Sequence, residues 1–138
     1  MLRGASFVIT SGLLQIMTSA VLNILLGLAV GPDALGSAFR ASHARDLKDP
    51  FMLYPLLIAP FVSASALWLF FQFFSPRGVS GSVSGGAALG FSLWTLGAGH
   101  GIVIDFATYA LDPLVVVFTL IVTFSQGALS GAILSRWV

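Results

Sequence analysis

The sequence contains no cysteine and very few charged residues. Without cysteine the chain can form no disulfide, no thiolate metal site and no cysteine nucleophile. Charged residues make up only 8% of its 138 residues, whereas a typical soluble domain carries roughly 25%. The formal net charge of +1 provides no basic surface, which excludes nucleic acid as a partner. Composition therefore excludes most soluble protein classes at the outset.

Long hydrophobic runs make up most of the sequence. The chain is 57% hydrophobic, with a mean hydropathy of +1.00. A transmembrane helix needs about 20 predominantly apolar residues to cross the hydrocarbon core. Four runs of this kind fill most of the chain, at about 5–30, 51–75, 86–110 and 113–135. We therefore predict one all-α domain, a polytopic membrane protein whose four transmembrane helices form an up-down-up-down bundle with both termini on the same side.

Most of the charge lies in the polar segment 31–50, "GPDALGSAFRASHARDLKDP". Within it Leu35, Phe39, His43 and Leu47 recur every four residues. This spacing is typical of a short helix on the membrane surface, although a solvated loop fits the segment equally well. Three basic residues lie on the terminal side of the predicted bundle and three lie in this segment. The positive-inside rule therefore gives no orientation.

Glycines are concentrated in the third and fourth runs. In a regular helix with about 100° per residue, Gly86, Gly90, Gly97 and Gly101 fall on one side of the third helix. The fourth run carries Gly127 and Gly131, four residues apart. Small residues at such spacings let two membrane helices approach closely. We predict that these six glycines are helix-packing positions and that the third helix is central.

Three polar side chains are expected near the middle of the bilayer. Gln15, His100 and Gln126 lie near the centres of the first, third and fourth runs, and Ser63 lies at the same level in the second. Polar groups in hydrocarbon are costly and turn inward to find partners. We therefore expect Gln15, His100 and Gln126 to meet at the bundle centre. Asp105 falls nearer the interface, where water or a lipid headgroup can reach it.

The simplest role for this midplane cluster is to fix helix register through hydrogen bonds worth about 0.6–2 kcal/mol each. A second interpretation makes His100 a ligand of haem or chlorophyll, since small neighbours would let a macrocycle approach the helix. The other histidine, His43, lies at the wrong depth to be a second ligand. A third interpretation is a transport path, which would need an oligomer because four helices are too few to enclose a pore. Its polar stations would be Gln15, Asn23, His100, Asp105 and Gln126.

Catalytic chemistry has no support in the sequence. It offers no paired carboxylates, no serine with a nearby base and no cluster of metal ligands. We predict a non-enzymatic protein with no catalytic or metal site. The favoured role is an accessory or packing subunit that binds other membrane subunits or copies of itself within the lipid bilayer. The transporter and the cofactor-carrying subunit stay open as alternatives.

The last 55 or so residues, from "GAALGFSLWTLGAGHGIVIDFATYALDPL" to "TFSQGALSGAIL", show a further pattern. A glycine-rich third helix with a tryptophan and a late aspartate is followed by a fourth helix with a glutamine and two spaced glycines. The residues concerned are Gly90, Trp94, Asp105, Gln126, Gly127 and Gly131. This half resembles small uncharacterised four-helix integral membrane proteins of bacteria and archaea. The resemblance implies the same topology and a prokaryotic inner (cytoplasmic) membrane, and it implies no activity.

Overall fold

The computed structural model describes residues 2–42, 50–74, 81–109 and 111–138, and over these ranges the secondary structure is helical with no strand. The elements, in chain order, are α1 (Leu2–Val30), α2 (Pro32–Ala41), α3 (Pro50–Phe74), α4 (Val83–Trp94), the π-helical turn η1 (Thr95–Gly99), α5 (His100–Tyr109) and α6 (Pro113–Trp137).

Four helical stretches are long and apolar enough to cross a membrane. They are Arg3–Val30, Leu57–Phe74, Val83–Phe106 and Pro113–Trp137. The third of these joins α4, η1 and most of α5 into one span. An all-helical fold with four long apolar helices is thereby confirmed, and the length and composition of these helices are those of an integral membrane protein.

The starts of two spans follow from short-range hydrogen bonding. The carboxylate of Asp112 accepts a 2.8 Å hydrogen bond from the backbone N–H of Leu114, and Pro113 occupies the first helical position of α6. Ser82 plays the same capping role for α4, accepting from the backbone N–H of Gly85 at 3.1 Å. Side chains that accept from the first free N–H groups of a helix are the standard way to begin one.

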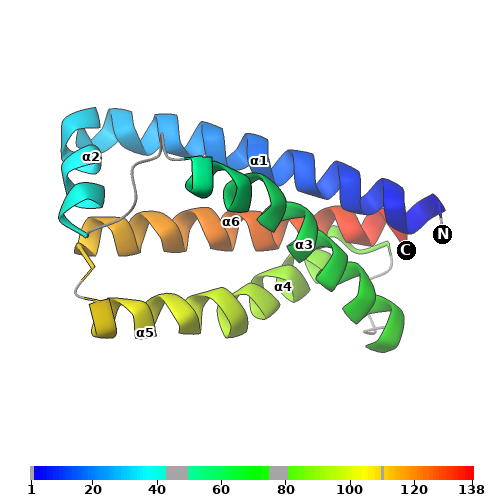
Figure 1. Ribbon diagram of the computed structural model, residues 1–138. Helices are drawn as coiled ribbons and strands as arrows, with labels where there is room; N and C mark the ends of the chain where they lie inside the picture. Colours follow the sequence, from blue (N-terminus) through cyan, green and yellow to red (C-terminus); the bar gives the residue numbers. More distant parts are fainter. Residues whose placement is uncertain (1, 43–49, 75–80, 110) are drawn as a thin grey trace.

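The spans pack side by side in an order different from their order in the sequence. α4 packs most extensively on α6, α6 packs on α1, and α1 packs on α3. Figure 1 shows α1 and α6 lying alongside each other, with α3 crossing them obliquely. The backbones of α3 and α4 do not approach each other extensively, although Leu89 and Leu93 of α4 pack on the buried cluster that contains Leu67 of α3. The order of backbone packing is therefore a row, α3–α1–α6–α4, rather than a closed ring. The third span packs closely on α6 but lies at one end of this row, so the prediction that it is central is wrong.

The closest packing lies between α4 and α6. A Cβ atom added to Gly86 would overlap the carbonyl oxygen of Gly131, and one added to Gly90 would overlap that of Gly127. The two helices thus touch backbone to backbone, in the manner that small residues permit in membranes. Since Gly86 faces Gly131 and Gly90 faces Gly127, the two helices run antiparallel.

The short helix α2 lies crosswise at one end of the row (Figure 1). Its buried Leu35 packs with Phe118 and Val122 of α6, and the ring of Phe39 meets Phe118 edge-on with ring centres 5.7 Å apart. The apolar side of α2 thus covers the start of α6, so the first half of the polar segment is helical. His43 and Leu47, which share the predicted surface-helix pattern, lie outside the described residues.

Candidate functional site

A buried hydrogen-bonded cluster joins three spans at the middle of the row. Gln15 of α1 is 2% exposed. Its Nε2 donates to the Oγ of Ser130 at 2.8 Å, and its Oε1 accepts from the Oγ of Ser63 at 3.0 Å. The Nε2 of Gln126 donates to the main-chain carbonyl of Gln15 at 3.0 Å. We call Gln15, Ser63, Gln126 and Ser130 the polar cluster. It links α1, α3 and α6 through four side chains.

The polar cluster contains two of the three residues expected at the midplane. Gln15 and Gln126 come together, but His100 is exposed on the outside of the row and joins no hydrogen bond of the cluster. The expected meeting of all three residues at the centre is therefore wrong for His100. Ser130 occupies the place in the cluster that the sequence predicts for His100. The sequence feature that points to Ser130 is its position four residues after Gln126, on the same face of the fourth helix.

The π-helical turn explains why His100 turns outward. A π-helical turn holds an extra residue compared with an α-helix, and one extra residue rotates everything after it by about 100°. The turn spans Thr95–Gly99 and so lies directly before His100. The same rotation divides the predicted glycine stripe. Gly86 and Gly90, before the turn, pack on α6, whereas a Cβ on Gly97 or Gly101 would meet nothing within 4 Å.

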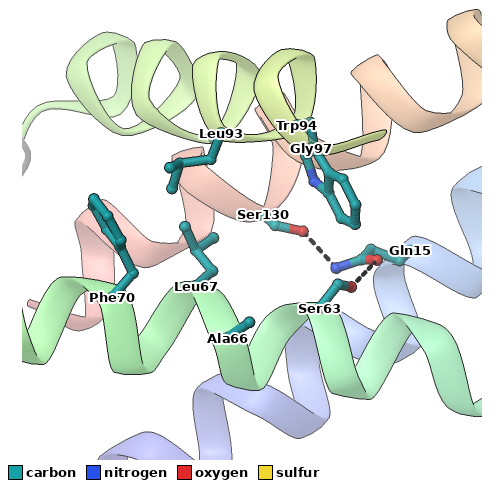
Figure 2. A pocket seen from close by; sticks show the side chains of 10 residues that line it. Gln15, Ser63, Ala66, Leu67, Phe70, Leu93, Trp94, Gly97 and Ser130 are labelled. Atoms are coloured by element: carbon teal, nitrogen blue, oxygen red, sulfur yellow. Dashed lines mark hydrogen bonds between the residues drawn. The ribbon is translucent and has the colours of Figure 1, made fainter. Parts of the chain in front are cut away.

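A cavity of about 270 Å³ opens between α3 and α4, where the row is not closed. We call it the lateral cavity. Figure 2 shows Gln15, Ser63 and Ser130 at its floor, with apolar side chains from both flanking helices around them. Trp94 lies against Gly127, so that the indole forms one wall beside the polar cluster. The lining residues are Gln15, Ser63, Ala66, Leu67, Phe70, Gly90, Leu93, Trp94, Gly97 and Ser130.

A second cavity, of about 470 Å³, continues from the same place toward α2. It shares Gln15, Ser63 and Trp94 with the lateral cavity and extends as far as Phe39. Hydroxyl and amide groups from α1 and α6 line its length: Ser19, Asn23, Thr119, Thr123 and Gln126. The two cavities thus adjoin at the polar cluster, and none of the described residues that line them is ionisable.

A second exposed surface runs from the π-helical turn into α5. Leu96 is 77% exposed and Ile104 is 48% exposed, and His100 lies between them at a spacing of four residues. We call Leu96, His100, Gly101 and Ile104 the α5 face. Asp105 is also exposed, one residue before the end of the span Val83–Phe106. A group bound to the His100 imidazole would lie outside the row, because His100 lines neither cavity described above.

Comparison of the chain with protein-family models, with curated proteins and with solved structures gave no match. The resemblance of its second half to small four-helix membrane proteins stays a prediction.

Proposed function

We propose that this protein is a non-enzymatic accessory subunit that packs against another membrane protein through the α5 face. The observation that carries the proposal is His100, an ionisable side chain exposed on the outside of a candidate span. Intramembrane ionisable residues almost always face a protein interior or a water-filled cavity, because lipid cannot hydrogen-bond to them. An outward-facing histidine therefore favours a protein partner that covers it.

The glycine beside His100 supports a helical partner. A Cβ on Gly101 would meet nothing within 4 Å, so the backbone is open to close approach at this point. Small residues on an open helix face allow a second membrane helix to come near enough for dispersion contacts and interhelical hydrogen bonds. Gly101 would admit the partner's backbone, while the imidazole of His100 would hydrogen-bond to it.

We also propose that the four spans alternate in direction and leave both ends of the chain on one side of a prokaryotic cytoplasmic membrane. The antiparallel contacts support the topology, since Gly4 of α1 lies against Trp68 of α3 while Gly12 lies against Phe61. The first turn of α1 and the last turn of α6 also lie close together (Figure 1). The choice of membrane rests on the resemblance of the second half of the sequence.

The test is co-purification from native membranes in mild detergent, followed by size exclusion with light scattering. We expect a larger protein at fixed stoichiometry with the wild-type chain, and its loss in Gly101→Leu. The matched control is Gly27→Leu, because Gly27 of α1 is also open within 4 Å but lies in another span. A photocrosslinking residue at position 100 should capture the same protein, whereas one at Leu28, which is 75% exposed, should not.

Other outcomes would replace this proposal. A colourless homo-oligomer of defined size would favour the oligomeric transporter. A co-eluting haem or chlorophyll band that His100→Ala abolishes would make the protein a cofactor-carrying subunit. Retention of the partner by Gly101→Leu, or its loss with both glycine variants, would remove the α5 face as the docking site.

A further inference from the structure

Several hydrogen-bond donors at the lateral cavity have no acceptor among the described residues. The Oγ of Ser130 accepts from Gln15, yet among the described residues the hydroxyl hydrogen of Ser130 has no acceptor. The indole N–H of Trp94 also has no acceptor within that part of the chain. Gln15 uses one of its two amide hydrogens. Three donors of different type therefore border one space.

These donors belong to a preformed site. Ser130 is 1% exposed and Gln15 is 2% exposed, and both are held by hydrogen bonds between α1, α3 and α6. A donor that is withdrawn from water and meets no acceptor loses a hydrogen bond without replacing it. A molecule that brought an acceptor to this floor would restore that hydrogen bond without reorganising the polar cluster.

The side chains that line the two cavities indicate the charge and polarity of a suitable ligand. No ionisable side chain is among the residues lining either cavity, so a charged ligand would have no counter-ion. Apolar side chains of Leu67, Phe70 and Leu93 surround the opening between α3 and α4. Because the opening lies between two candidate membrane spans, entry would be from the bilayer. Cavities of about 270 and 470 Å³ fall within or near the usual range for small ligands, about 300–1,000 Å³.

We propose that the lateral cavity binds a neutral, lipid-soluble molecule whose polar group is a hydrogen-bond acceptor, such as the carbonyl of a ketone or quinone. The carbonyl would accept from Ser130 and Trp94 beside Gln15. An apolar tail would lie against the apolar residues Ile16, Phe118 and Val122 of the second cavity or leave through the opening. A phospholipid chain at this depth offers no acceptor, because its ester groups lie at the interface. The site lies between α3 and α4, so it does not depend on a partner at the α5 face.

The test uses a matched pair of probes, 2-decyl-1,4-naphthoquinone and 2-decylnaphthalene, which differ only in the two carbonyls. The background variant Trp68→Phe/Trp137→Phe leaves Trp94 as the single tryptophan of the three in the chain, so its fluorescence reports on the cavity. We expect saturable binding of one naphthoquinone per chain. Ser130→Ala should raise its dissociation constant about three- to tenfold, as the loss of one hydrogen bond predicts. The value for decylnaphthalene should not change.

A second variant tests the space rather than the donors. Ala66 lines the opening and is exposed, so Ala66→Phe should fill it and weaken binding of both probes. Ala88→Phe, at an exposed position of α4 outside the cavity lining, is the control and should bind as the background does. Circular dichroism and a single elution peak verify folding. If Ser130→Ala does not fold, Ser130→Cys, which keeps the size but weakens the donor, replaces it.

Three results would overturn the proposal. These are quenching that does not saturate, equal effects of Ser130→Ala on the two probes, and unchanged quinone binding in Ala66→Phe. The first would mean that the probe only partitions into the micelle, and the second would mean that the site does not recognise the carbonyl. Gly101→Leu should leave quinone binding intact, so failure of this proposal and failure of the accessory role are separate outcomes.

Discussion

Replacing Gly90 by alanine should destabilise the protein, whereas the same replacement at Gly101 should not. A Cβ on Gly90 would overlap the carbonyl oxygen of Gly127 and lie 2.9 Å from its carbonyl carbon and 3.0 Å from the Cα of Gly131. All three atoms are backbone, so no side chain can rotate away. The added methyl group can be accommodated only if α4 and α6 move apart along their most extensive contact.

The magnitude follows from two opposing effects. Overpacking in a closely fitted contact costs about 1–3 kcal/mol, because a gap of about 0.5–1 Å forfeits a quarter to a half of each dispersion well. Alanine is favoured over glycine within a helix by about 0.5–1 kcal/mol. For Gly90→Ala the net expectation is a loss of about 1–2 kcal/mol. For Gly101→Ala the Cβ meets nothing within 4 Å. Only the greater helix preference of alanine applies there, so this variant should be slightly more stable than the wild type.

The assay is reversible unfolding of the purified protein in mixed micelles with rising SDS fraction, followed by tryptophan fluorescence and circular dichroism. The two variants should shift the unfolding midpoint in opposite directions. A wild-type midpoint for Gly90→Ala would refute the backbone contact between α4 and α6. Equal destabilisation by both variants would show that Gly101 packs inside the row, against the open environment seen here.

Three further predictions concern the polar cluster and the helix ends. Gln15→Leu removes the hydrogen bonds to Ser63 and Ser130. Since such bonds in membranes average about 0.6 kcal/mol and reach about 2, the free energy of unfolding should fall by about 1–2 kcal/mol. The SDS assay measures this change, and an unchanged unfolding midpoint would contradict the prediction. Asp112→Ala should cost about 1 kcal/mol through loss of the α6 cap, while Asp112→Asn should retain most of the stability in a thermal melt. Ser42→Ala removes the hydroxyl that accepts the backbone N–H of Asp112 at 2.8 Å, so hydrogen exchange at that amide should accelerate; unchanged protection would place the contact elsewhere.

Local sequence chemistry accounts for much of what the structure shows. Apolar runs of sufficient length, an aspartate followed by proline, and glycines at a spacing of four all act within one helix or at its end. The positions of Asp112 and Pro113 thus predict where α6 begins. Gln15 and Gln126 turn inward because lipid offers them no hydrogen bond, whatever the neighbouring helix is.

His100 shows where such reasoning fails. Its expected direction assumes a constant rotation of about 100° per residue, and the π-helical turn at Thr95–Gly99 breaks that regularity. Two glycines within the turn lower the preference for a regular α-helix. The packing of Trp94 on Gly127 and of Gly99 on Phe124 then holds the altered geometry. These are contacts between α6 and the third span, which no pattern within one segment contains.

By itself, the sequence determined the number of apolar spans, the helical class and the inward direction of Gln15 and Gln126, because these depend on each segment's interaction with hydrocarbon. Only the tertiary structure decided that the row stays open between α3 and α4, that Gly97 and Gly101 remain uncovered, and that Ser130 completes the polar cluster. In lipid no solvent-driven force closes a bundle. Which spans lie next to each other is therefore set by backbone contacts between helices, such as those that Gly86 and Gly90 of α4 make with α6.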